Sequence, residues 1–120
     1  MDRKKELKQQ YKLIKPDMGV FIIRLKEGGK CYLQATPDLR GVMNGAIARL
    51  NGGGHPNQEL QKDWSAKGAD AFVMEILERL AYNKDESKTD YSEELAILQL
   101  IVEEKMQKEN YELYKKKILK

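Results

Sequence analysis

Two short stretches of strand-forming residues on either side of a glycine turn constrain the fold more than any other part of the sequence. Residues 20–23 (VFII) are β-branched or aromatic, and residues 31–34 (CYLQ) follow them after the turn Glu27-Gly28-Gly29-Lys30. β-branched and aromatic residues favour strands, and glycines between two such runs favour a turn. We therefore expect an antiparallel β-hairpin that begins near Met18.

A helix is expected directly after the hairpin. Thr36-Pro37-Asp38 supplies a capping hydroxyl, a proline at the first helical position and an acid in the first turn. Apolar residues then recur at offsets of three and four, which is typical of a helix with one buried face. These residues are Leu39, Val42, Met43, Ala46, Ile47 and Leu50, and the run Asn51-Gly52-Gly53-Gly54 ends the helix.

The remaining elements follow from local signals of unequal strength. His55-Pro56-Asn57 begins a shorter helix, which Gly68 closes. Residues 72–80 alternate like a strand but fit one face of a helix equally well, so periodicity leaves both open. Further helices are expected over residues 1–15 and 90–119.

The size and composition of the chain exclude several classes of protein. A chain of 120 residues can bury one core, so we expect a single domain over residues 1–120. Its one cysteine, Cys31, excludes an internal disulfide and a cysteine-based zinc cluster. No apolar run approaches the roughly 20 residues of a membrane helix, and the polar N-terminus is unlike a signal peptide. We expect a cytoplasmic protein without a membrane partner.

Basic residues gather at both ends of the chain, although the net charge of +3 alone is too small to argue for nucleic acid. Such clusters can bind DNA or RNA through phosphate contacts, or they can be solvated helix surfaces. The candidate phosphate contacts are Arg3, Lys4, Lys5, Lys8, Lys115, Lys116 and Lys117. The charged second half of the helix over 90–119 either covers the domain or presents a surface to a protein partner or a second copy.

The order of these elements resembles the GIY-YIG nuclease superfamily. Gly19-Val20-Phe21 and Tyr32-Leu33-Gln34 stand where its two signature triplets stand. The stretch HPNQELQKDWSAKGADAFVMEILERL is also similar to the family pattern in residue type and spacing. The resemblance covers residues 18–80 and implies an α+β fold. Its core would be a small three-stranded antiparallel sheet flanked by helices, with residues 72–80 as the third strand.

The resemblance also implies which side chains would carry phosphodiester cleavage. Tyrosines of both triplets would position or deprotonate the attacking water, and an arginine on the first helix would neutralise the transition-state phosphate. A glutamate on the last helix would hold one divalent metal ion. Phosphoryl transfer depends on such electrostatic stabilisation and on the charge of the metal.

This sequence departs from that set of residues at several positions. Phe21 stands at the position of the first tyrosine, and Gln34 stands at the glycine that ends the second triplet. On the first helix, Val42 stands at the position of the arginine and Ala46 at that of a histidine. Val42 and Ala46 belong to the apolar stripe, so we expect the former polar face to have become packing surface.

Two residues of the family pattern are kept, and the metal ligand is ambiguous. Tyr32 keeps the second tyrosine, and His55 keeps the histidine after the glycine-rich bend. Without a catalytic role, Tyr32 would be a half-buried strand residue and His55 a brace for the following helix. The metal-binding glutamate corresponds to Gln99 in one register and to Glu94 in a shifted one.

Three functional hypotheses follow. The leading one is a degenerate, non-catalytic domain that acts as a binding or interaction module associated with nucleic acid, with no cofactor. The alternative is a divergent, weak endonuclease that uses Tyr32, His55 and an acid such as Glu94 with Mg²⁺. The third is a regulatory adaptor that acts through its terminal helix.

Overall fold

The computed structural model describes residues 15–85 and 87–114. The expected N-terminal helix over 1–15, apart from Lys15, and the basic residues proposed as phosphate contacts lie outside this part. The strands are β1 (Met18–Leu25), β2 (Lys30–Thr36), β3 (Phe72–Leu80) and β4 (Glu112–Leu113). The helices are α2 (Leu39–Gly52), α3 (Gln58–Lys67), the short 3₁₀ turn η1 (Ala69–Ala71) and α4 (Ser92–Lys108). None of the described helices is long and apolar enough to cross a bilayer.

The sheet has the strand order β3-β1-β2-β4, with β1 antiparallel to both of its neighbours. Strand β1 is buried almost throughout, and this explains its continuous apolar run. Gly19 lies where the backbones of β1 and β3 are too close for a side chain, because a Cβ atom at this position would be 2.0 Å from the carbonyl oxygen of Glu78. The glycine of the first triplet is therefore required by packing alone, whatever the domain does.

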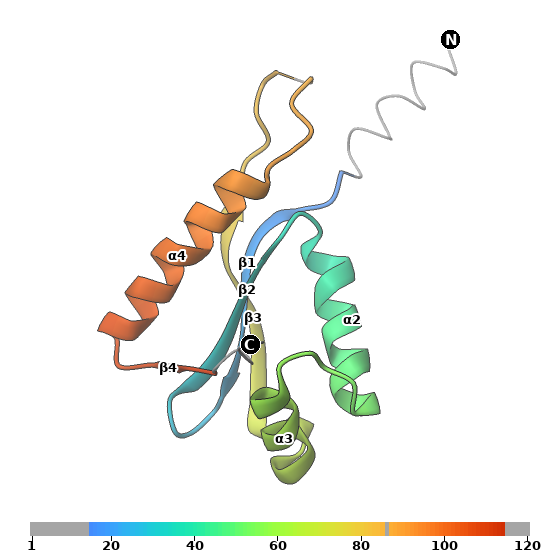
Figure 1. Ribbon diagram of the computed structural model, residues 1–120, viewed down its shortest axis with the longest axis vertical. Helices are drawn as coiled ribbons and strands as arrows, with labels where there is room; N and C mark the ends of the chain where they lie inside the picture. Colours follow the sequence, from blue (N-terminus) through green and yellow to red (C-terminus); the bar gives the residue numbers. More distant parts are fainter. Residues whose placement is uncertain (1–14, 86, 115–120) are drawn as a thin grey trace, which may run out of the picture.

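The sheet separates two hydrophobic layers (Figure 1). Helices α2 and α3 cover one face, here called the α2 face, and α4 covers the other, the α4 face. Side chains alternate along β1 between the two faces, as the pleat of a strand requires. Phe21 and Ile23 pack on the α2 face with Leu50 of α2, whereas Val20 and Ile22 pack on the α4 face.

The expectation of a three-stranded, purely antiparallel sheet is wrong. Residues after α4 add a fourth strand, which pairs with the edge of β2 in the parallel direction. The amide of Glu112 donates to the carbonyl of Gly29 (2.9 Å), and that of Tyr114 donates to the carbonyl of Cys31 (2.8 Å). The phenol of Tyr114 then donates to Asp63 of α3 (2.8 Å), so this segment ties the sheet edge to the α2 face.

The expectation of one helix over residues 90–119 is also wrong, because α4 ends at Lys108. Asn110 adopts a left-handed conformation (φ 70°). The amide of Asn110 donates to Gln107, and that of Tyr111 donates to Met106. These two bonds form a Schellman motif, in which asparagine is among the residues that tolerate the left-handed position. The chain therefore leaves the helix axis and turns back toward β2.

Two local expectations have different outcomes. Residues 72–80 form a strand, as the resemblance implies. Helix α2, however, begins at Leu39, two residues later than the expected start at Pro37. Asp38 is the N-cap and accepts from the amide of Gly41 (3.1 Å), while the hydroxyl of Thr36 accepts from the amide of Asp38 (3.1 Å).

Candidate functional site

Tyr32 and His55 lie together on the α2 face. Tyr32 is on β2 opposite Ile23 and packs against the core of this face, and His55 precedes α3. Their ring centres are 5.1 Å apart and the rings are nearly perpendicular (88°). Edge-to-face packing of this kind contributes to stability in addition to burial. The two retained residues are therefore in direct contact.

The hydroxyl of Tyr32 is already engaged in a hydrogen bond. It donates to Oε1 of Gln34 at 2.9 Å, two residues along the same strand and therefore on the same face. Burial raises the pKa of Tyr32, and the positive charge of Arg49 offsets this only in part. A phenol that donates a hydrogen bond and has a raised pKa is poorly suited to accept a proton from water. Gln34, at the position of the signature glycine, supplies the acceptor, which the sequence alone did not reveal.

His55 is buried and braces the start of α3. Its Nδ1 accepts from the amide of Asn57 (3.0 Å), and Asn57 in turn caps α3 by accepting from the amide of Leu60 (3.0 Å). The backbone amide of His55 donates to Gln61 (2.9 Å). Burial lowers the pKa of His55, and the positive charge of Arg49 lowers it further. With its net pKa lowered, the ring is neutral at neutral pH.

Apolar side chains stand at three positions where the resemblance would place polar groups. Phe21 is fully buried, with its ring 6.5 Å from that of Tyr32. Ala46 is 3% exposed, and Val42 is partly buried against the same core. Both come from α2, one turn apart, so they share one side of this helix. The expected packing surface is therefore present at these three positions.

Arg49 places a positive charge near the two retained residues, since it lowers the pKa of both Tyr32 and His55. It is exposed and lies seven residues after Val42, which is two helical turns along the same side of α2. Sequence reasoning missed it because the family position for an arginine is two turns earlier. The signal in the sequence was the spacing of seven residues between Val42 and Arg49, which places both on the same side of the helix.

Gln99, one candidate for the metal-ligand position, binds the backbone of β2. Its Oε1 accepts from the amide of Ala35 (3.1 Å), and its Nε2 donates to the carbonyl of Leu33 (3.4 Å) and to Glu103 (3.0 Å). Gln99 thereby provides hydrogen-bond partners for backbone groups of β2 that lie beyond the two residues paired with β4. Only an amide can accept and donate in this way, so a glutamate would not make the same contacts.

Glu94, the other candidate, lies in the first turn of α4 and forms an ion pair with Lys88 (2.8 Å). The hydrogen bond with Lys88 lowers the pKa of Glu94. Across residues 15–85 and 87–114, no group of three or more histidine, cysteine, aspartate or glutamate side chains is arranged to hold a metal ion. Glu94 is therefore placed beside a cation rather than in a cluster of carboxylates.

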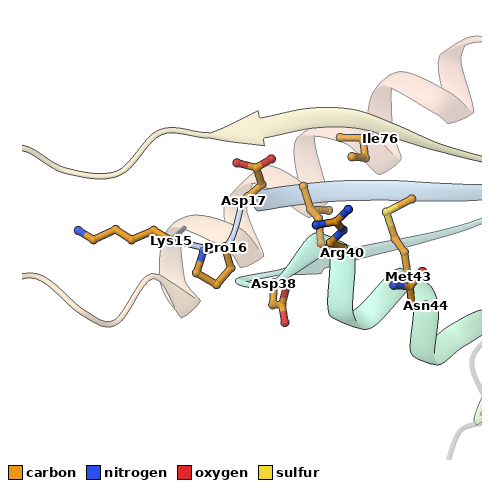
Figure 2. A pocket seen from close by; sticks show the side chains of 9 residues that line it. Lys15, Pro16, Asp17, Asp38, Arg40, Met43, Asn44 and Ile76 are labelled. Atoms are coloured by element: carbon orange, nitrogen blue, oxygen red, sulfur yellow. The ribbon is translucent and has the colours of Figure 1, made fainter. Parts of the chain in front are cut away.

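A surface pocket of about 630 Å³ lies beside the first turns of α2 (Figure 2). Arg40, Met43 and Asn44 of α2 line it, together with Asp17, which precedes β1, and Ile76 of β3. Its lining residues do not include Tyr32 or His55. The pocket is thus separate from the site that the resemblance indicates.

Comparison with known proteins supports the fold. The structure matches the catalytic domain of the homing endonuclease I-TevI with a TM-score of 0.62 and 20% sequence identity, over 82% of this chain and 98% of that one. A mutant of the same catalytic domain matches with a TM-score of 0.60 and 20% identity, over 87% and 99% of the two chains. No protein-family model and no curated protein sequence gave a significant match.

These matches establish the fold of the chain. The described part of the chain has the fold of a GIY-YIG endonuclease catalytic domain, with a fourth strand at the β2 edge. I-TevI, whose catalytic domain this chain resembles in fold, is a GIY-YIG homing endonuclease. At 20% identity this likeness concerns the fold, and the chemistry has to be argued from the residues described above.

Proposed function

We propose that this chain is a non-catalytic GIY-YIG domain that binds the phosphate backbone of nucleic acid without cleaving it. The observation that carries the proposal is the state of Tyr32. Its hydroxyl is bound to Gln34, its ring packs on His55, and apolar residues occupy the positions around it. A side chain held in this way stabilises the α2 face instead of activating water.

The electrostatic requirements of cleavage support the same proposal. Phosphoryl transfer needs positive charge at the transferred phosphate, and an arginine in that place is worth about 10³ to 10⁵ in rate. Val42 supplies none at the family position, and Arg49 lies two turns further along α2. Gln99 is committed to the backbone of β2, and Glu94 is paired with Lys88. The proposal therefore requires no metal ion.

The binding function rests on positive charge that remains accessible. Arg40 and Arg49 are exposed on α2, and Arg49 adjoins the Tyr32–His55 pair. The basic clusters at the two ends of the sequence (Arg3, Lys4, Lys5, Lys8 and Lys115–Lys117) would add phosphate contacts. Such contacts release counterions, so the affinity would fall as salt rises and would depend little on base sequence.

Fluorescence anisotropy with labelled DNA and RNA of several sequences tests the binding function. Between about 50 and 200 mM salt, the logarithm of the association constant should fall linearly with the logarithm of salt, with a slope of about −0.9 per phosphate contact on duplex DNA. Combined Arg3→Gln, Lys4→Gln, Lys5→Gln and Lys8→Gln substitutions should make the slope less steep. Lys67→Gln with Lys105→Gln is the control on exposed lysines elsewhere. Absence of binding at low salt, or binding that ignores salt, would refute this function.

A further inference from the structure

The pocket beside the first turns of α2 has a wall that hydrogen bonds hold in place. Residues 15–17 form this wall. The hydroxyl of Tyr82 donates to the carbonyl of Pro16 (2.6 Å), and the amide of Leu39 donates to the carbonyl of Asp17 (2.9 Å). The volume of about 630 Å³ falls within the range of about 300–1,000 Å³ that is usual for ligand pockets. The pocket is therefore a preformed cavity.

The lining of the pocket combines apolar contacts with positive charge. Met43 of α2 and Ile76 of β3 are partly buried and pack against the core of the α2 face. Arg40 and Lys15 also line the pocket, and both are exposed. The ammonium group of Lys15 lies over the ring of Tyr82, 5.1 Å from its centre, so the lysine is held beside the wall. The pocket thus offers apolar surface for a flat ligand and cations for a negatively charged one.

Two carboxylates also line the pocket, and they differ in how firmly they are held. Asp38 caps α2 by accepting from the amide of Gly41 (3.1 Å), and Figure 2 shows its carboxylate pointing away from Asp17. Asp17 lies 3.6 Å from Nε of Arg79, and these two side chains are 67% and 63% exposed, respectively. A screened surface pair of this kind holds its members weakly. Asp17 is therefore the hydrogen-bond acceptor that a ligand in the pocket can reach.

We propose that this pocket takes one unpaired nucleobase of a single-stranded nucleic acid, with the carboxylate of Asp17 accepting from an amino group of the base. The proposal rests on the nucleic-acid function proposed above and names its substrate class. A carboxylate repels phosphate, but it accepts a hydrogen bond from the exocyclic amine of cytosine. Met43 and Ile76 would contact the base, and Arg40 and Lys15 would bind the phosphates on either side of it.

The charge around the pocket agrees with a ligand that carries both a base and phosphates. Lys15, Arg40 and Arg79 supply three positive charges there. Asp17 and Asp38 supply two negative ones, so the surroundings are net positive. The basic residues of positions 3–12 also directly precede Lys15 in the sequence.

Two consequences follow for the choice of nucleic acid. The bases of a duplex are stacked and paired, so only a single strand, or a base displaced from its stack, can enter the pocket. Uracil has a carbonyl oxygen where cytosine has its amino group, and the carboxylate of Asp17 would repel that oxygen. Phosphate contacts still supply most of the affinity, and the pocket adds a preference for single strands and for cytosine over uracil.

Fluorescence anisotropy of the full chain at constant low salt tests the proposal. The labelled probes are oligo(dC) and oligo(dU) of about 12 nucleotides, a length typical of single-strand sites, and a mixed-sequence strand with its duplex. Oligo(dC) should bind about tenfold more tightly than oligo(dU), and the mixed single strand more tightly than its duplex. Asp17→Asn should bring the dC/dU ratio close to one, because an amide can also donate to the uracil carbonyl. Arg40→Gln should weaken both oligonucleotides and lower the salt slope by about 1.

Asp70→Asn is the matched control, since it removes the same charge from an exposed position before the opposite end of β3 and should keep the dC/dU ratio. Circular dichroism confirms that each variant is folded. Excess deoxycytidine monophosphate should compete weakly, because it lacks the flanking phosphates.

The outcomes separate this proposal from the function on which it rests. Binding of no nucleic acid at all would refute both. Equal affinity for single strand and duplex, or for oligo(dC) and oligo(dU), would overturn the base pocket and leave phosphate-backbone binding standing. The same holds if Asp17→Asn keeps the full preference for oligo(dC). Competition by deoxycytidine monophosphate as strong as that by unlabelled oligo(dC) would assign the pocket to a free nucleotide and overturn the single-strand proposal.

Discussion

Replacing Gln99 by glutamate tests whether this position is a latent metal site or a structural contact. A carboxylate cannot donate to the carbonyl of Leu33 or to Glu103, as Nε2 of Gln99 does. Leaving a buried polar group without its partner costs about 1–3 kcal/mol. The new charge would also stand near Glu103, and like charges at about 4 Å repel by about 1 kcal/mol in water and about 4 kcal/mol near a protein surface. Both side chains are partly buried, so the free energy of unfolding should fall by about 2–4 kcal/mol at neutral pH.

Urea unfolding of the Gln99→Glu variant measures this loss, and Gln107→Glu is the matched control. Gln107 is exposed on the same helix, so its replacement adds the same charge without removing these contacts. The loss should shrink at acidic pH, because one of the two carboxyl groups can then hold a proton. Mg²⁺ or Mn²⁺ should stabilise Gln99→Glu no more than the parent chain. A variant as stable as the control, or one that a divalent metal stabilises selectively, would refute the structural interpretation.

Three further predictions concern the sheet and the Tyr32 site. Gly19→Ala should lower the free energy of unfolding by about 2–3 kcal/mol, because its Cβ would overlap a β3 carbonyl at 2.0 Å; an unchanged urea midpoint would contradict this close approach. Val42→Arg should cost about 1–2 kcal/mol without creating cleavage, since Val42 packs against the core. Asn44→Arg on the exposed part of the same helix is its control, and equal stability of the two would show that Val42 is not packing surface. His55 should titrate below 6.5 in an NMR experiment, so stability should fall as the pH decreases through and below that value. His55→Asn, which keeps an acceptor for the Asn57 amide, should lose this component, whereas a pKa at or above 6.5 would contradict the burial argument.

Much of the fold could be predicted because its signals are local. The hairpin depends on strand-forming residues around two glycines, and α2 and α3 depend on apolar spacing and their terminal residues. Residues 72–80 could not be assigned from periodicity, because both templates fit. These residues form a strand because they pair with β1 along their whole length, and such pairing depends on the folded chain.

The end of α4 and the fourth strand escaped prediction for a related reason. The charged residues after Glu103 have good helix propensity, and nothing in their pattern marks a two-residue strand. Asn110 was the available signal, because asparagine tolerates a left-handed position after a helix. The parallel pairing of β4 with β2 depends on contacts between distant parts of the sequence, which helix propensity does not report.

The apolar packing at the candidate site could be predicted in part, but its hydrogen bonds could not. The packing of Ala46 follows from the apolar stripe. The acceptor supplied by Gln34 and the backbone contacts of Gln99 do not. Both depend on side-chain amides whose partners are set by the register of β2 and the placement of α4.

A cleavage assay on the purified chain tests the central claim most directly. Supercoiled DNA, linear DNA and RNA are incubated with Mg²⁺ or Mn²⁺, and the products are compared with those of a Tyr32→Phe variant prepared in the same way. We expect no cleavage above background and no difference between the two proteins, because the Tyr32 hydroxyl donates its hydrogen bond to Gln34 and Val42 supplies no charge at the family's arginine position. Metal-dependent cleavage that Tyr32→Phe abolishes would contradict the account and establish a divergent endonuclease instead.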